Sequence, residues 1–325
     1  GGGRPVILAA VILGGWLPAA PGVTEDNETC LACHGQRGGG IPFVDAERFR
    51  ASIHGGNLCL SCHEDAAEPP HAPRLKPVDC GTCHRLETEV YLQSDHGKAL
   101  SRGVSAAATC TSCHGHTHTL LSSRDPRSPV HRRHIAETCA TCHADHKRMA
   151  GFRLTQQEPF DTYSHSVHGE AFGAGGVNAA TCSDCHGTHD LHGAANPLSK
   201  VYRGHVSGTC GRCHENVKAI YDRSIHGRAG HEGIREAPVC TDCHGEHTIR
   251  MVRDPSSQVY RGAVTKTCSA CHESERIIAK FGLPADRLKT FMDSYHGLAS
   301  RWGDLHAANC ASCHGWHDVL PSSDT

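Results

Sequence analysis

Every cysteine of this chain lies in a C-x-x-C-H pentapeptide, and the pentapeptide occurs ten times in 325 residues. Disulfides, zinc sites and thioether-linked groups each predict a different cysteine spacing. The paired cysteines are Cys30/Cys33, Cys59/Cys62, Cys80/Cys83, Cys110/Cys113, Cys139/Cys142, Cys182/Cys185, Cys210/Cys213, Cys240/Cys243, Cys268/Cys271 and Cys310/Cys313. The histidines that close the motifs are His34, His63, His84, His114, His143, His186, His214, His244, His272 and His314.

The motif predicts covalent haem attachment. On a helical turn, positions i, i+3 and i+4 share a face, so two thioether bonds can hold a porphyrin edge while the histidine reaches the iron. A structural zinc site combines two half-sites and does not require a histidine directly after each second cysteine. Because all twenty cysteines follow one pattern, we expect ten haem c groups rather than zinc or disulfides.

The composition agrees with a core that is not made of side chains alone. Aromatic residues make up only 5% of the chain, and its formal net charge is −2. The charge pattern offers no basic stripe, so nucleic-acid binding is not expected. Two propionates on each haem would make the holoprotein more acidic, which would steer basic partners.

A second motif, S-x-H-G, shows that the haem motifs come in pairs. Its histidines are His54, His96, His168, His226 and His296. In all but the first, the next haem motif begins 14 residues later. The chain is therefore expected to be one continuous ten-haem domain of five two-haem modules. These modules are residues 25–75, 76–130, 131–200, 201–260 and 261–325.

Electron-transfer haems usually have a second strong axial ligand, and 19 further histidines are present. Those that recur at fixed positions are the expected distal ligands. They are the five S-x-H-G histidines and, beyond each second motif, His71, His118, His189, His247 and His317. The last three lie three residues after a motif histidine, which we expect to place them on the same short helix. Each should then ligate the haem of a neighbouring module.

Two ligand choices stay open at this stage. His146 competes with His71 for the tenth distal position, and His116 competes with His118. The other extra histidines recur at no fixed spacing and are expected to be solvated or hydrogen-bonded. They include His131, His134, His192, His205, His231 and His306. Met149, Met251 and Met292 share no common position, so packing is the expected role.

The spacing between motifs limits the fold. Between 16 and 38 residues separate successive motifs, which is too short for an inserted β-barrel or Rossmann unit. We expect a multihaem cytochrome c fold: short α-helices and long loops wrapped around a chain of stacked haems, with almost no β-sheet. The haems would replace a conventional hydrophobic core.

The N-terminus is apolar. Residues 5–23 carry no charge and follow Arg4. Residues 1–24 are therefore expected to be a secretory signal peptide or an N-terminal membrane anchor, and these two alternatives stay open. Either one implies export to the periplasm or the cell exterior.

Residues 30–317 resemble the multihaem cytochromes c, through C-x-x-C-H, S-x-H-G and the C-H-G-x-H form at His186, His244 and His314. The resemblance is to periplasmic decahaem electron-transfer cytochromes and to extracellular cytochromes that polymerise into nanowires. It implies thioether-bound haems with two histidine ligands. The segment PSSDT at residues 321–325 is similar to the joint SSRDP at residues 122–126, which raises the hypothesis of end-to-end filaments.

The expected function is passive electron transfer, without catalysis, between redox partner proteins. The partners would be a membrane quinol oxidase or other cytochromes. One alternative is a multihaem oxidoreductase of the nitrite, hydroxylamine or tetrathionate type, with one open iron site. Another is the haem subunit of a membrane respiratory complex. Because every motif ends in histidine and spare histidines are plentiful, electron conduction is the preferred interpretation.

Overall fold

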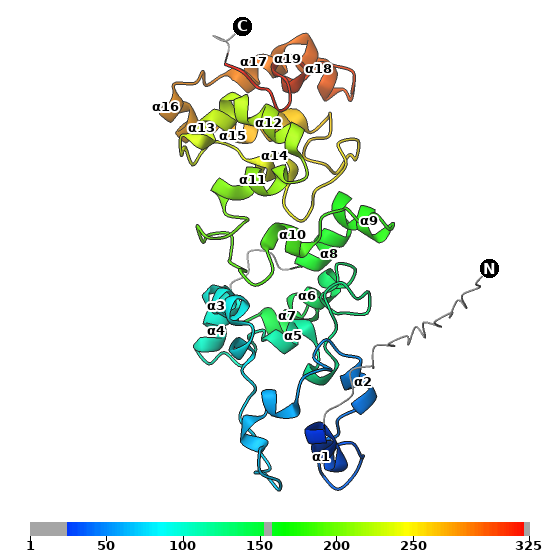
Figure 1. Ribbon diagram of the computed structural model, residues 1–325. Helices are drawn as coiled ribbons and strands as arrows, with labels where there is room; N and C mark the ends of the chain where they lie inside the picture. The colour runs from blue at the N-terminus through cyan, green and yellow to red at the C-terminus, as the bar shows by residue number, and fades with distance from the viewer. Residues whose placement is uncertain (1–24, 153–157, 322–325) are drawn as a thin grey trace, which may run out of the picture. The chain divides into compact units, whose positions relative to one another are not determined.

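A computed structural model of the chain describes residues 25–152 and 158–321, and these are helical, with no β-strand among them (Figure 1). The expectation of short helices and almost no sheet is confirmed for these residues. The predicted signal or anchor at residues 1–24 lies outside the described residues. Within the described ranges, the search for a long apolar helix that could span a membrane found none.

The chain forms two compact units. The first comprises the described residues up to Asp79 together with His116–Leu121, and the second comprises Cys80–Gly115 and the described residues from Ser122 onward. The segment His116–Leu121 of module 2 belongs to the first unit because it contacts residues of module 1. The backbone N–H of Ile53 donates to the carbonyl of Leu120, and the ring of His118 lies beside that of His63.

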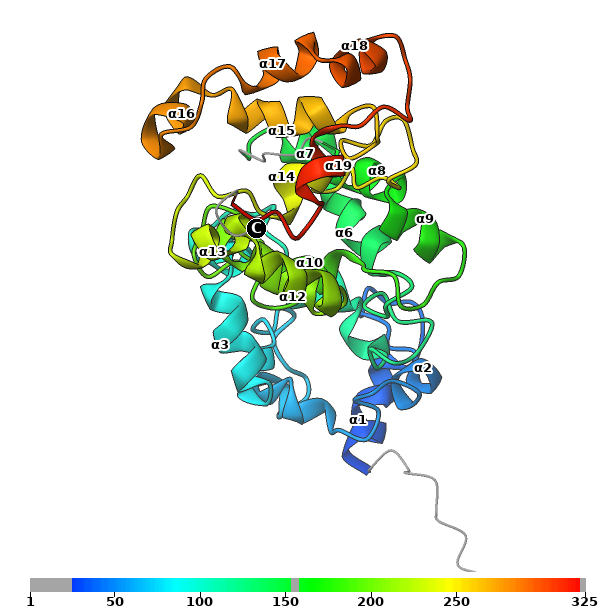
Figure 2. The ribbon, with the colours of Figure 1, turned by 90° about the horizontal axis from the view of Figure 1, so that it is seen from above.

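All five modules contain helices (Figure 2). Module 1 holds α1 (Glu25–His34), α2 (Ala46–Arg50), η1 (Cys59–Ser61) and η2 (Glu64–Ala66). Module 2 holds η3 (Cys80–Thr82), α3 (Arg85–Gln93), α4 (Asp95–Ser101), α5 (Cys110–His114) and η4 (Thr117–Thr119). Module 3 holds α6 (Ile135–His143), α7 (His146–Met149), α8 (Pro159–Ser164), α9 (Val167–Gly173) and α10 (Cys182–His186).

The last two modules repeat this order. Module 4 holds η5 (Arg203–His205), α11 (Val206–Gly211), α12 (Glu215–Arg223), α13 (Ile225–His231) and α14 (Cys240–His244). Module 5 holds α15 (Val264–His272), α16 (Glu275–Phe281), α17 (Arg287–Asp293), α18 (Tyr295–Arg301) and α19 (Cys310–His314). In modules 2 to 5, a pair of helices that meet at the S-x-H-G serine thus lies between the two haem motifs.

The S-x-H-G motif builds the corner of each helix pair. In module 4, the Ser224 side chain caps α13 by accepting a hydrogen bond from the backbone N–H of Gly227 at 3.0 Å, and it donates to the carbonyl of Tyr221 at 2.7 Å. A Cβ atom on Gly227 would collide with that same carbonyl oxygen. The serine and glycine therefore fix a tight turn that places His226 in the first turn of the second helix.

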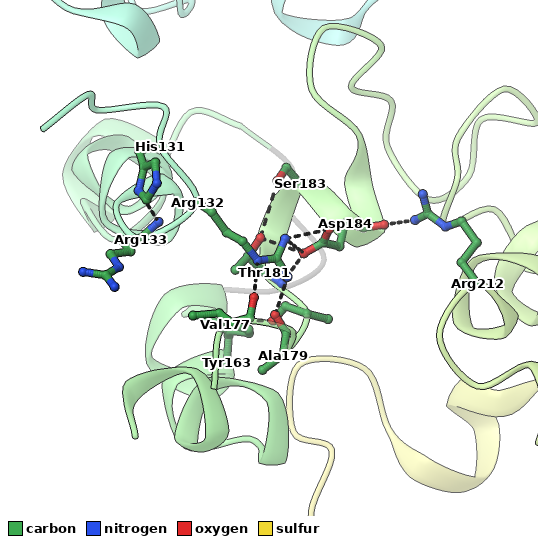
Figure 3. A network of polar contacts seen from close by, with 11 residues as sticks. His131, Arg132, Arg133, Tyr163, Val177, Ala179, Thr181, Ser183, Asp184 and Arg212 are labelled. Carbon is green, nitrogen blue, oxygen red and sulfur yellow. Dashed lines mark hydrogen bonds and ion pairs between the residues drawn. The ribbon is translucent and has the colours of Figure 1, made fainter. Parts of the chain in front are cut away.

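An arginine ties the beginning of a module to its second haem motif (Figure 3). In module 3, Arg132 donates to the carbonyls of Val177 and Ala179, and its guanidinium lies 2.8 Å from the carboxylate of Asp184. The same carboxylate accepts hydrogen bonds from the backbone N–H and hydroxyl of the buried Thr181. The network holds the loop that leads into α10.

Module 4 repeats this clamp with different residues. Arg203 donates to the carbonyls of Arg235 and Ala237 and pairs with Asp242. Tyr221 adds a hydrogen bond of 2.8 Å from its hydroxyl to the carbonyl of Pro238. Tyr221, on the first helix of the pair, and Arg203, at the start of the module, therefore both fix the loop before the second haem motif.

The polypeptide buries few apolar side chains of its own. Among the described residues, the buried hydrophobic positions are Ala136, Val206, Ala237, Val264 and Ala311. The most completely buried side chains are serines and a threonine of the turns. Side-chain packing alone does not supply an ordinary core.

Candidate functional site

Each second haem motif of modules 2 to 5 forms a five-residue helix that ends at its histidine. The glycine that follows adopts a positive φ, such as 91° at Gly187 and 81° at Gly245, which reverses the chain direction. His189, His247 and His317 therefore lie beyond the helix. The prediction that they share the helix of the motif histidine is wrong, because the glycine ends it.

Eight motif histidines lie opposite another histidine, and in every pair the second residue is one of the predicted distal ligands. With their ring-centre distances, four pairs are His34–His71 (5.8 Å), His63–His118 (6.1 Å), His143–His96 (6.1 Å) and His114–His189 (6.1 Å). The other four are His214–His168 (6.2 Å), His186–His247 (5.8 Å), His272–His226 (6.1 Å) and His244–His317 (6.0 Å).

This spacing suits one metal ion held between two imidazoles. Metal–nitrogen bonds to histidine are about 2.0 Å long, so two opposed bonds place the ring centres about 6 Å apart. In the His34–His71 pair, both Nδ1 atoms are engaged with backbone carbonyls, of Pro42 and Ala72, at 2.8 Å. Such outer hydrogen bonds orient a ligating imidazole and leave Nε2 as the coordinating atom. The residues present therefore fit a haem iron with two histidine ligands.

The pairs follow a register that links consecutive modules. An S-x-H-G histidine faces the first motif of the next module, as in His96–His143, His168–His214 and His226–His272. In return, the histidine beyond the second motif faces the second motif of the previous module. These pairs are His118–His63, His189–His114, His247–His186 and His317–His244. The joints of modules 2 to 5 thus exchange ligands in the two directions.

The backbone reinforces the same register. In modules 1 to 4, the residue before the S-x-H-G histidine donates its backbone N–H to a carbonyl of the next module. That carbonyl belongs to the residue two positions after the post-motif histidine. The donor and acceptor pairs are Ile53–Leu120, Asp95–Leu191, Val167–Ile249 and Ile225–Val319, at 2.8 to 2.9 Å. The ligand exchange is therefore built on a repeated backbone contact. The sequence analysis missed this contact because no side-chain pattern marks it.

The eight pairs fall into two classes by ring orientation. The rings opposite His34, His114, His186 and His244 are stacked, with interplanar angles of 5° to 20°. The rings opposite His63, His143, His214 and His272 are tilted by 39° to 49°. The S-x-H-G histidines form three of the tilted pairs.

Burial favours the neutral, coordinating form of several of these imidazoles. Burial, with smaller contributions from the neighbouring His247 and His143, lowers the pKa of His186 to about 4. Burial likewise lowers the pKa of His226 to about 4, with a smaller contribution from His272. A neutral imidazole is the form in which histidine binds a metal.

The motifs lie in space in the order of the sequence within each compact unit. The first cysteines of the two motifs of one module contact each other in four modules: Cys30–Cys59, Cys139–Cys182, Cys210–Cys240 and Cys268–Cys310. Cysteines of successive modules approach each other at Cys113–Cys142, Cys185–Cys210 and Cys243–Cys271. His84 and His114 interact within module 2. No disulfide joins any of the twenty cysteines, all of which lie in the described residues.

The twenty cysteines differ in their exposure. The second cysteine is exposed in five motifs, at Cys33, Cys62, Cys83, Cys213 and Cys313. Among the first cysteines, only Cys110 is exposed. The second cysteines of the other five motifs, Cys113, Cys142, Cys185, Cys243 and Cys271, are half-buried, because each approaches a cysteine of a neighbouring module.

The exposure of each cysteine follows from the position of its motif. At the joint of modules 3 and 4, the contact is made by Cys210, which leaves Cys213 on the outer side of its helix turn. An exposed sulfur is open to reaction with a porphyrin vinyl group, so exposure is compatible with attachment. Thioether bonds at Cys33, Cys62, Cys83, Cys213 and Cys313 stay a prediction, as they do at the half-buried positions.

The structure separates the competing histidines. His71 lies opposite His34, whereas the His146 ring lies 3.4 Å from the carboxylate of Glu158. His118 lies opposite His63, and His116 accepts a hydrogen bond from the backbone N–H of His118. The histidines expected to be solvated or hydrogen-bonded include His192, which is buried and hydrogen-bonded to Asn196. His205 is hydrogen-bonded to the carbonyl of Ser199.

The remaining predicted ligands occupy defined positions. His54 is half-buried in the turn after α2, and His84 directly precedes α3. His296 is in the first turn of α18, and His314 ends α19. These last two are exposed, and no histidine ring lies opposite either of them in the described part of the chain.

The described residues offer paired ligands and no cluster of three or more histidine, cysteine or acidic side chains that could hold a metal ion by themselves. Comparisons with protein-family models, with curated proteins and with solved structures gave no match. The argument for function therefore depends on the geometry of the histidine pairs and on the motifs.

Proposed function

We propose that this chain binds ten haem c groups and conducts electrons along them as an exported electron carrier. The observation that carries the proposal is the set of eight histidine pairs, each with its rings about 6 Å apart and each containing one motif histidine. When bound, haem iron supplies reversible one-electron oxidation and reduction.

The chain's own residues would have three tasks. The two cysteines of each motif anchor the group, the motif histidine binds one side of the iron, and a histidine from elsewhere occupies the other side. An iron with both axial positions filled by imidazole exchanges electrons without binding substrate. The proposal therefore assigns no catalytic residue to these eight sites.

The contacts between cysteines of successive motifs support a continuous path. Because the motifs follow one another in space as they do in sequence within the second unit, electrons would pass from module 2 to module 5 in chain order. We propose redox proteins, either a quinol oxidase or other cytochromes, as donor and acceptor. The proposed location is the periplasm or the cell exterior, with membrane association through residues 1–24 as an alternative to cleavage.

The intact mass of the purified native protein tests the proposal. The expected mass exceeds that of the polypeptide by ten haem groups that persist under denaturing conditions, because thioether bonds are covalent. The reduced protein should show the sharp visible bands of six-coordinate haem. A colourless protein with the mass of the bare chain would refute the proposal. The same mass measurement also shows whether residues 1–24 are present.

A further inference from the structure

One histidine pair differs from the others in the contacts of its outer ring nitrogens. In the His34–His71 pair, the Nδ1 atoms donate hydrogen bonds of 2.8 Å to the carbonyls of Pro42 and Ala72. Within the described part of the chain, it is the one pair of the eight in which both rings have a backbone carbonyl as acceptor. Such hydrogen bonds raise the basicity of a ligating imidazole. The two carbonyls therefore favour ferric iron at this site.

Two other pairs have the opposite arrangement. Among the described residues, the Nδ1 atoms of His63 and His247 are buried and have no hydrogen-bond partner. With Nε2 on the iron, each ring would carry an N–H group without an acceptor and would be a weaker electron donor to the metal. His63 lies opposite His118, and His247 lies opposite His186. These two sites therefore favour ferrous iron more than the carbonyl-bonded pair does.

Burial acts in the same direction at the site of His186 and His247. This pair and the His34–His71 pair are both stacked at a ring-centre distance of 5.8 Å, so their ligand geometry is alike. Burial lowers the pKa of His186 and of His247, whereas the hydrogen bonds of His34 and His71 are exposed. A surrounding of low dielectric constant disfavours the more positively charged ferric state. The carboxylate of Glu246, beside His247, opposes this effect, but it is exposed and solvent screens its charge.

We propose that the haem held by His34 and His71 has the lowest reduction potential of the eight paired sites, and that the haems of His63 and His247 lie at the upper end of the range. The determinants are the two backbone carbonyls at the first site and the buried N–H groups without acceptors at the other two. This inference rests on the proposed haem binding and adds an order to it.

The order gives electron transfer a direction within module 1. The first cysteines of its two motifs, Cys30 and Cys59, contact each other, so the sites of His34 and His63 are neighbours. An electron on the first site passes to the second, because the iron of His34 is oxidised to the ferric state as the iron of His63 is reduced to the ferrous state. The first motif of module 1 therefore accepts an electron and hands it to the second.

A redox titration of the ten-haem protein, followed in the visible spectrum, tests this order. Methionine in place of a distal histidine raises the potential of the haem that it faces, so the titration loses one component at the original potential of that haem. His71→Met should remove a component from the lower end of the titration. His118→Met and His247→Met should each remove one from the upper half. His306→Met is the matched control, because His306 is an exposed histidine without a ligand role, and it should leave every component in place.

The wild-type protein provides a second measurement that does not depend on the folding of a variant. Nearly parallel imidazole rings give ferric haem a different electron paramagnetic resonance signal from tilted rings, because they split the iron d orbitals more strongly. The His34–His71 and His186–His247 pairs both belong to the nearly parallel class, with angles of 5° and 20°. During stepwise reduction, the signal of this class should therefore disappear in separate steps, one at high potential and one at low potential.

Two results would overturn the proposed order. One is a component lost in His71→Met at or above the potential of the component lost in His247→Met. The other is a signal of the nearly parallel class that disappears in a single narrow step. Intact mass and visible spectrum identify a failure of haem binding separately, because a protein without ten haems refutes the proposed function instead.

Discussion

The imidazole of His186 in module 3 stacks on that of His247 in module 4, with ring centres 5.8 Å apart and planes 20° apart. Neither module holds this pair alone. Because the neighbouring joint is built in the same way, the proposed haem ligation would couple to module packing throughout modules 3 to 5. Loss of one distal histidine should therefore affect both the iron it faces and the stability of the joint.

Replacing His226 by methionine should raise the reduction potential of one haem out of ten, because a thioether ligand favours ferrous iron more than imidazole does. All ten haems should remain attached, since the thioether anchors are untouched. A spectrally monitored redox titration measures the change. His231→Met is the control, because His231 lies on the same helix but is 3.2 Å from the carboxylate of Asp222. An unchanged titration for His226→Met would contradict its ligand role.

Low-spin ferric haems should give two classes of electron paramagnetic resonance signal. Parallel imidazole planes split the iron d orbitals that interact with the ring π systems more strongly than tilted planes do. His189→Ala, which removes a ring from an 11° pair, should reduce the signal of the first class. His226→Ala removes a ring from a 49° pair and should reduce the other signal. Identical spectral changes in the two variants would argue against distinct ring orientations.

Gly227→Ala should destabilise the protein by about 1–3 kcal/mol, because the new methyl group meets the carbonyl of Tyr221 and forces the two helices of module 4 apart. Gly230→Ala on the same helix is the control. Its nearest neighbour would be the Tyr221 hydroxyl at 3.7 Å, so it should be neutral or stabilising by about 0.5–1 kcal/mol. Denaturant unfolding gives both values. Equal stability for the two variants would show that the corner does not require glycine.

Arg203→Ala should cost about 1–3 kcal/mol, because two backbone carbonyls and the Asp242 carboxylate lose their donor. Lys289→Ala is the comparison. Lys289 is 80% exposed in its pair with Asp293, so its loss should leave the free energy of unfolding close to that of the wild type. Parallel urea titrations measure the difference. If Arg203→Ala unfolds like Lys289→Ala, the clamp does not hold the loop.

Glu236 should make the protein less stable as the pH falls. A hydrogen bond from Lys280 holds the pKa of this carboxyl below its usual value of 4.5, with a further contribution from Arg276. Because the pKa is lowered in the folded state, its stabilisation is present above the unfolded pKa and is lost as the pH falls through the folded one. The stability difference between wild type and Glu236→Gln should therefore shrink as the pH drops below about 4.5. A constant difference would contradict this pairing.

Much of the candidate site could be predicted from the sequence because its histidines recur at fixed spacings from the C-x-x-C-H motifs. The fixed spacing of the S-x-H-G and post-motif histidines identified the residues that the structure brings opposite motif histidines. His146 resembled a post-motif histidine in spacing but follows a first motif, where α6 is followed by α7 and no glycine reverses the chain. A choice between His71 and His146 therefore required the fold.

Other features escaped sequence reasoning for physical reasons. Helix ends depend on backbone conformation, and the positive φ of Gly187 and Gly245 was not apparent from the spacing of their neighbours. The serine and glycine of S-x-H-G were treated as markers of a ligand, whereas they act as a helix cap and a point of close backbone approach. The pairing register needed coordinates, because it connects residues in different modules. The exposure of Cys213 beside the half-buried Cys210 needed them for the same reason.

The reciprocal register makes the modules interchangeable in principle. Removing the whole of module 3 would leave His96 without His143 and His214 without His168. The two histidines that remain, His96 and His214, are an S-x-H-G histidine and a first-motif histidine, the same combination that pairs at the other joints. The same holds for His114 and His247. An array of this design can be shortened or extended by whole repeats while each new boundary still finds its complement, so the length of the proposed conductor would be independent of the chemistry of its joints.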